Sequence, residues 1–137
     1  MTDVHIQAEG ISVQLDLVDV DQNDPGSPCW RINLELSHPT GRFSYIADDI
    51  WIDTDVWDTF ESELVAGVRS CAIFHDLSDY FVIKLERKDR CFEISVVVRE
   101  FLATKGDLSM SAKYMVDLDN VFVDRFRDGF AAYQKFW

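Results

Sequence analysis

Apolar and polar residues alternate along most of this chain, and this period of two restricts it to a fold rich in β-strands. The odd positions from 11 to 17 are Ile, Val, Leu and Leu, while polar side chains fill the even positions. A strand with this pattern buries one face and exposes the other. The alternation returns at residues 30–36, 43–51, 81–85, 92–98 and 108–116, and a short strand or connection is expected near residues 71–74.

Two segments replace this alternation with apolar spacings of three and four, which are typical of one face of a helix. The first contains Trp57, Phe60, Leu64 and Val68, and the second Phe122, Phe126, Phe130 and Tyr133. Asp53, Thr54 and Asp55 offer N-caps and favourable negative charge where the first helix begins, and Gly67 is placed to end it. Asp119 or Asn120 is expected to cap the second helix.

Turn-forming residues separate these segments. Residues 21–28, rich in Asp, Asn, Pro and Gly, predict a loop. Short turns at 37–41, 87–90 and 104–107 favour hairpins, and therefore antiparallel pairing. Val18 and Val20 fall on the opposite parity from Leu17, which indicates a bulge or the end of that strand.

The two halves of the chain share one order of elements. Residues 29–36 align with residues 91–98, and the first helix aligns with the second. We therefore predict two βββα repeats, at about residues 11–68 and 71–137. The predicted fold class is α+β: a largely antiparallel sheet with two helices packed on one face, in a single domain spanning residues 1–137.

Composition favours a folded cytoplasmic protein. The chain of 137 residues is 47% hydrophobic, which supports a core without disulfides or metal. Its three cysteines, Cys29, Cys71 and Cys91, form no CxxC motif and are expected to be small buried side chains. The first residues lack the pattern of a signal peptide, and no apolar run is long enough to span a membrane.

The acidic excess lies wholly in the first half. Residues 1–68 hold 14 Asp and Glu against two basic residues, Arg31 and Arg42, whereas residues 69–137 are balanced, and the whole chain carries a net charge of −12. This segregation predicts an acidic face for a basic protein partner and disfavours nucleic-acid and membrane binding.

The densest acidic stretch is residues 48–58, which places carboxylates around Trp51 near the start of the first helix. Trp is enriched among binding hot spots, and carboxylates complement Lys and Arg on a partner. Helix capping and, less favoured, a metal site are alternative interpretations. The predicted partner-binding residues are Asp48, Asp49, Trp51, Asp53, Asp55 and Asp58, with Asp19, Asp21 and Asp24 from the preceding loop.

Enzymatic motifs are absent from the sequence. No nucleophile elbow, Walker loop or GxGxxG occurs, and the three histidines are scattered. The spacing of the acidic stretch fails the EF-hand pattern. His75 and Asp76 offer only a weak acid/base pair. We therefore expect a non-catalytic protein with no metal and no cofactor.

The order of these signals resembles the WapI-type immunity proteins of bacterial polymorphic toxin systems. The resemblance covers roughly residues 11–134 and is carried by hydrophobic patterns: Trp30-x-Ile32-x-Leu34, Trp57-x-x-Phe60-x-x-x-Leu64, Phe81-x-Ile83-x-Leu85, Phe92-x-Ile94-x-Val96, and Phe126 with Phe130. It implies a small cytosolic protein that binds and neutralises a cognate toxin, and it carries over no catalytic residue.

Two other functions stay open. One is a small-ligand-binding or enzymatic α+β domain, with a pocket between sheet and helices lined by Trp30, Trp57, Tyr80 and Tyr114. The other is an assembly module that homodimerises through an exposed strand edge. The sequence is therefore compatible with a monomer or a homodimer.

Overall fold

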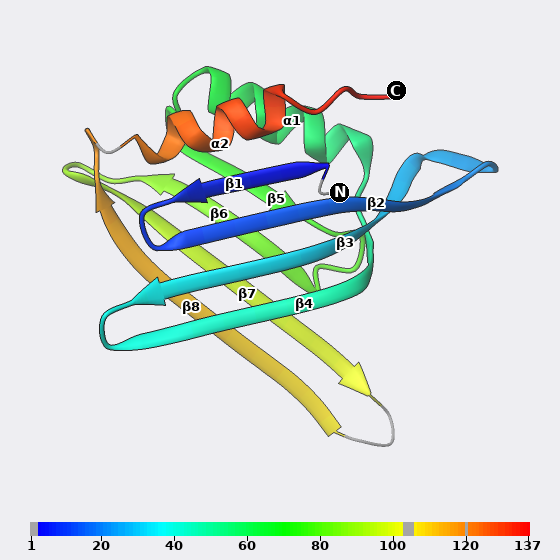
Figure 1. Cartoon of the computed structure of the whole chain (residues 1–137), viewed down its shortest axis with the longest axis horizontal. Coiled ribbons are helices and arrows are strands. Elements are labelled where there is room, and N and C mark those ends of the chain that lie inside the picture. Colours follow the sequence, from blue (N-terminus) through cyan, green and yellow to red (C-terminus); the bar gives the residue numbers. More distant parts are fainter. Residues whose placement is uncertain (1–2, 103–105, 120) are drawn as a thin grey trace.

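The chain runs twice through four strands followed by one helix (Figure 1). The structure is a computed structural model that describes residues 3–102, 106–119 and 121–137. The first repeat comprises β1 (Val4–Ala8), β2 (Ile11–Asp21), β3 (Asp24–His38), β4 (Gly41–Trp51) and α1 (Thr54–Val65). The second comprises β5 (Cys71–His75), β6 (Phe81–Arg87), β7 (Cys91–Leu102), β8 (Gly106–Asp117) and α2 (Phe122–Ala131).

The strands form two four-stranded antiparallel sheets, ordered β1-β2-β3-β4 and β5-β6-β7-β8. The predicted α+β class, antiparallel pairing and two repeats are confirmed. The sheet itself is divided: each repeat makes its own sheet, and each has four strands where the alternation predicted three. Figure 1 shows one sheet in front of the other with their strands crossing at an angle.

Strand register shows that many positions of the two repeats correspond, although the first repeat has register shifts in β2 and between β3 and β4 that the described second repeat lacks. Trp30 pairs with Ile50, and the corresponding Phe92 pairs with Val116. Leu15 lies opposite Ile32, as Leu85 lies opposite Ile94. β1 pairs antiparallel with β2 as β5 pairs with β6, so the repeat extends to β1 and β5, the strands that sequence periodicity missed or left undecided.

The helices are exchanged between the repeats. α1 packs mainly against β5, the first strand of the second sheet, whereas α2 packs mainly against β1, the first strand of the first sheet. Both helices lie on one side of the molecule (Figure 1), as predicted, and they also contact each other. Because each helix covers the other repeat's edge strand, neither repeat can bury its apolar helix face alone.

The core is continuous across both repeats. The inward faces of both sheets and the apolar faces of both helices contribute side chains to one buried cluster. Tyr45 of β4 stacks on Phe81 of β6 with ring centroids 5.7 Å apart, which joins the two sheets directly. Burial raises the pKa of Tyr45 to about 12, with the Glu100 and Asp76 carboxylates adding to the rise, so its hydroxyl stays protonated.

The capping residues expected from the sequence occur at the ends of α1 but not at the start of α2. Asp53 caps α1, accepting a hydrogen bond from the Asp55 N–H at 2.8 Å, and Gly67 has the positive φ of +80° that ends the helix. The predicted cap of the second helix at Asp119 is wrong, because α2 starts after Val121, which offers no capping side chain. Asn120 lies outside the described residues.

The predicted loop at residues 21–28 is also wrong. Only residues 22 and 23 turn, and β3 already begins at Asp24. Pro25 and Pro28 fit an extended backbone and lack only an N–H to donate, and the Pro28 carbonyl still accepts from the Ile52 N–H at 3.1 Å. The bulge predicted near Val18 is confirmed by a register shift between Leu17 and Asp19. The predicted turn at 104–107 falls largely outside the described residues.

We predict that Gly129→Ala destabilises the fold, because a Cβ there would collide with Ile6 Cγ1 where α2 crosses β1. The corresponding residue of α1 is Glu63, so glycine is required by this contact and not by the repeat. Overpacking of this kind costs roughly 1–3 kcal/mol, against up to about 1 kcal/mol gained in helix propensity. Urea denaturation measures the difference.

Gly41→Ala is the matched control, because a Cβ at Gly41 would meet no atom within 4 Å. It should leave the free energy of unfolding within about 0.5 kcal/mol of the unmodified protein. A Gly129→Ala variant as stable as the Gly41→Ala variant would contradict the close approach of α2 to β1.

Candidate functional site

The acidic residues predicted to bind a partner come from two separate segments, and the fold brings most of them to one end of the molecule. The β2–β3 hairpin meets the end of β4 there: Cys29 pairs with Asp19 on one side and with Trp51 on the other. A Cβ at Gly26 would lie 3.9 Å from Thr54 Oγ1, so the hairpin also reaches the start of α1. We call this surface the acidic end; it comprises Asp19, Asp21, Asp24, Asp48, Asp49, Trp51, Asp53 and Asp55.

The acidic end is poor in neutralising cations. Arg31 Nε lies 2.6 Å from Asp48 Oδ1, on the outer face of the first sheet, and both side chains are more than half exposed. Asp19, Asp21, Asp24, Asp49 and Asp55 are exposed, and none of them has an ion pair among the described residues. Asp48 is therefore the one partly neutralised carboxylate of the described acidic end.

Trp51 is held in place by one of these carboxylates. Its indole Nε1–H donates to Asp49 Oδ1 at 2.8 Å, and the ring is half-buried at the end of β4. The Cys29 thiol donates to the same oxygen at 3.5 Å. Burial, reinforced by the Asp49 and Asp19 carboxylates, raises the pKa of Cys29 to about 11. This cysteine is thus a neutral thiol at physiological pH and not a nucleophile.

Several of the remaining carboxylates also shape the local backbone. Asp21 Oδ1 accepts the Asn23 N–H at 2.9 Å and sets the tight turn of the hairpin. Asp19 Oδ1 accepts the Val20 N–H at 2.8 Å beside the bulge. Both side chains are exposed, and a carboxylate can accept several hydrogen bonds, so a backbone role does not prevent either from meeting a cationic partner.

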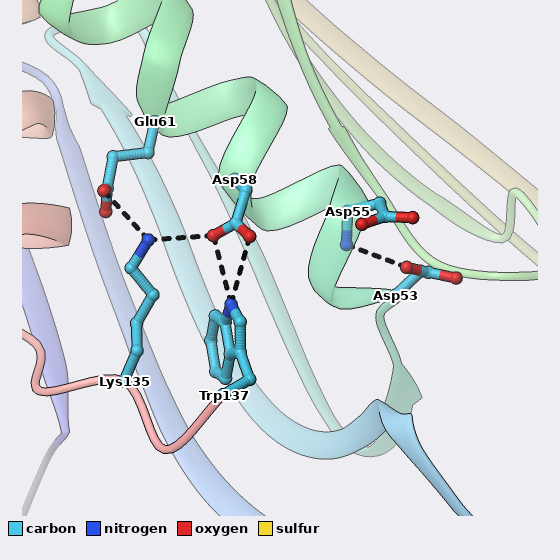
Figure 2. A network of polar contacts seen from close by, with 6 residues as sticks. All are labelled: Asp53, Asp55, Asp58, Glu61, Lys135 and Trp137. Atoms are coloured by element: carbon cyan, nitrogen blue, oxygen red, sulfur yellow. Dashed lines mark hydrogen bonds and ion pairs between the residues drawn. The ribbon is translucent and has the colours of Figure 1, made fainter.

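Asp58, also predicted to bind the partner, has a different environment. Figure 2 shows its carboxylate pointing to the C-terminal segment, away from Asp53 and Asp55. Its Oδ1 lies 2.8 Å from Lys135 Nζ, and the Trp137 indole donates to both of its oxygens at 3.1 and 3.2 Å. Lys135 also lies 3.1 Å from Glu61. We call these four side chains, Asp58, Glu61, Lys135 and Trp137, the C-terminal clasp.

Contacts within the clasp favour the ionised forms of Asp58 and Lys135. Burial by itself would raise the pKa of Asp58, but the hydrogen bonds from Lys135 and Trp137 outweigh it and hold that pKa below its usual value. The same contact with Asp58 raises the pKa of Lys135. Sequence reasoning missed Glu61, Lys135 and Trp137. The available signal was the i, i+3 spacing of Asp58 and Glu61, which places two carboxylates on one helix face.

Other chemistry suggested by the sequence does not assemble. His75 Nδ1 lies 3.0 Å from Asp79 and 2.9 Å from the Asp76 carbonyl, while the Asp76 carboxylate accepts the Phe81 N–H, so the pair of His75 with that carboxylate is not formed. Within residues 3–102, 106–119 and 121–137, no group of three or more metal-ligating side chains comes together. None of the helices in these ranges is long and apolar enough to cross a membrane.

The predicted pocket between sheets and helices is filled by its own aromatic residues. Trp30 and Trp57 are fully buried and stack with ring centroids 4.9 Å apart. Tyr80 is exposed in the loop before β6, and Tyr114 lies on β8 near Gly10. These four side chains therefore do not line one cavity.

Comparisons of the chain with protein-family models, with curated proteins and with solved structures found no match. The resemblance to WapI-type immunity proteins thus remains a prediction that rests on the sequence pattern.

We predict that Asp58→Asn lowers stability at neutral pH and that the loss disappears in acid. The lowered pKa of Asp58 means that its ionised form stabilises the folded state above the unfolded carboxyl pKa, and that this contribution is lost as pH falls through the folded pKa. Because Asp58 is 46% exposed, the expected loss is only roughly 0.5–1 kcal/mol at pH 7. Urea denaturation at a series of pH values from about 2.5 to about 7 measures the loss, because carboxyl groups titrate within this range.

Asp89→Asn is the control, because it removes the same charge from the exposed turn between β6 and β7. Its stability should follow that of the unmodified protein across the range. A deficit of Asp58→Asn that stays constant down to the lowest pH would show that packing, and not charge, explains the clasp.

Proposed function

We propose that this protein is a non-catalytic cytoplasmic inhibitor of the immunity type, which neutralises a basic partner such as a nuclease toxin through the acidic end. One observation carries the proposal: residues 19–24 and 48–55, distant in sequence, lie at one end of the fold with most of their carboxylates exposed and without cations. Folding of the apolar core does not require this arrangement, since the second repeat builds the same frame with balanced charge.

The electrostatic part of the proposal concerns association. Unpaired carboxylates on a protruding hairpin create a negative potential that attracts a basic surface before contact is made. Such steering raises the association rate and makes it fall with ionic strength. A nuclease active site, which must attract phosphates, offers the complementary positive surface.

Trp51 supplies the specific contact in this proposal. A binding hot spot is commonly a large aromatic side chain surrounded by polar groups. The hydrogen bond from its indole to Asp49 fixes the ring before binding, so little conformational entropy is lost on association. Asp58 is left out of the proposed surface, because the clasp already occupies its carboxylate.

A homodimer is the second candidate. β8 pairs only with β7 among the described strands, and its 12 residues carry the exposed apolar side chains of Leu108, Met110 and Met115. An edge strand of this length is a template for pairing with a second copy. Size-exclusion chromatography with light scattering distinguishes this candidate, because it predicts a dimer in the absence of any partner.

We predict that neutralising four acidic-end residues weakens partner capture. The variant carries D19N, D21N, D24N and D55N; it spares Asp49, which holds Trp51, and Asp53, which caps α1. Asn keeps an oxygen acceptor for the local turns. The assay is binding kinetics against the product of the adjacent upstream gene, with an expected fall of the association rate of about tenfold or more at low salt.

The matched control neutralises four exposed carboxylates of the second repeat, in the variant D89N, D107N, D117N and D119N. It makes the same change in net charge and should bind nearly as fast as the unmodified protein. A partner without a basic surface, an affinity insensitive to salt, or an equal loss in both variants would refute the electrostatic proposal.

A further inference from the structure

A cleft lies at the opposite end of β3 from the acidic end. The β3–β4 turn and residues 111–114 of β8 enclose a cleft of about 470 Å³, and Gly10 of the β1–β2 turn also lines it. β4 and β8, the two strands that contribute most of this lining, cross at an angle (Figure 1). The volume lies in the range of small-molecule sites, about 300–1,000 Å³.

Small side chains keep the cleft open. Gly10 has φ +82°, which the tight turn requires, and a Cβ there would sit 3.2 Å from the Ser37 carbonyl oxygen and 3.8 Å from the Tyr114 ring. Across from it β8 carries Ala112, while Leu36 and Phe43 provide apolar walls. The interior thus suits an apolar body.

The charged side chains that line the cleft are basic, whereas the whole protein carries a net negative charge. The basic lining residues are Arg42, Lys113 and His38, and no carboxylate is among the described residues that line the cleft, although the chain holds 25 Asp and Glu. Arg42 lies 3.4 Å from Glu35 and Lys113 lies 3.4 Å from Glu93, with both cations more than 60% exposed. Such loose surface pairs contribute little, so either cation can turn to an incoming anion.

One polar group in the cleft lacks a partner. The Tyr114 hydroxyl oxygen is buried and makes no hydrogen bond within the described part of the chain. Burial, with the Glu9 carboxylate as a second cause, raises the pKa of Tyr114, so the group remains a hydrogen-bond donor. Buried donors are normally satisfied, and an acceptor atom on a bound molecule would satisfy this one.

We propose that this cleft binds a small organic anion, with its apolar body against Leu36, Phe43 and Ala112 and its negative group at the exposed rim, where Arg42 and Lys113 can turn towards it. Tyr114 donates a hydrogen bond to an oxygen of the ligand. A ligand site usually consists of an apolar hollow with a few polar residues that converge on it. The inference is independent of the acidic end and of its protein partner.

The test uses two dyes that share an aromatic body and differ in charge. The anion is 1-anilinonaphthalene-8-sulfonate, and its uncharged counterpart is N-phenyl-1-naphthylamine. Fluorescence titration of the folded protein should give saturable binding of the anion and weaker binding of the neutral dye. Decanoate should compete with the anionic dye, and both should shift the amide resonances of Gly10 and Gly41, which line the cleft.

Charge variants test the site itself. The double variant R42Q and K113Q should weaken binding of the anionic dye by about tenfold and leave that of the neutral dye unchanged. The matched control, K88Q and R90Q, removes two cations from the β6–β7 turn and should bind as the unmodified protein does. Tyr114→Phe should weaken decanoate binding with the fold intact, checked by its amide spectrum.

Three results would overturn the proposal. These are the absence of saturable shifts at Gly10 and Gly41, equal affinity for the two dyes, and an equal loss in the R42Q and K113Q variant and in its control. Failure of toxin binding would leave these outcomes unaffected, because none of the four substituted cations belongs to the acidic end.

Discussion

The aromatic contact around Trp57 joins four elements, and the exchange of helices depends on it. From α1, Trp57 packs against Trp30 of β3 at 4.9 Å, Phe74 of β5 at 5.8 Å and Phe130 of α2 at 4.7 Å between ring centroids. Both sheets and both helices therefore meet at one side chain that is 1% exposed. Large aromatic side chains dominate core energetics, and this one stabilises the two repeats only when both are present. The Trp30 and Trp57 indole N–H groups are buried without a hydrogen-bond partner in the described residues. Each unsatisfied group costs about 1–3 kcal/mol. The packing of each ring outweighs that cost, because truncating a buried Trp costs roughly 3–5 kcal/mol.

The repeated frame was predictable because it depends on local periodicity. Alternation at residues 30–36 and 92–98, helical spacing from Trp57 to Leu64, and the Asp53 cap all agree with the structure. The division into two sheets could not be predicted, because alternation shows that one face of a strand is buried but not what covers it. β1 escaped notice because only Val4 and Ile6 are fully buried in a strand of five residues. Residues 24–28 were assigned to a loop on composition, although extended backbone accommodates proline at a hairpin end.

The site residues also divide into those that the sequence could predict and those that it could not. Charge density identified the acidic end because carboxylates on a hairpin and at a helix start stay exposed wherever the chain folds. It could not separate Asp58 from Asp55, which lie three residues apart on α1, because the difference comes from Lys135 and Trp137, more than 70 residues later. The cleft had no sequence signal at all. Arg42, Gly10 and Lys113 converge only through the crossing of β4 and β8.

In the structure, the acidic end lies at one end of β3 and the cleft with its basic side chains lies at the other. Of the two cations in the first half, Arg31 lies beside Asp48 at the acidic end, and Arg42 lies at the cleft. Cys29 and Ser37 mark these two ends of β3, and eight residues of extended chain span about 26 Å. Since the Debye length at physiological ionic strength is about 8 Å, the field of the acidic end is largely screened at that distance. A strongly acidic protein can therefore present a surface for a basic partner and keep, at the far end of the same strand, a cleft whose local charge favours an anion.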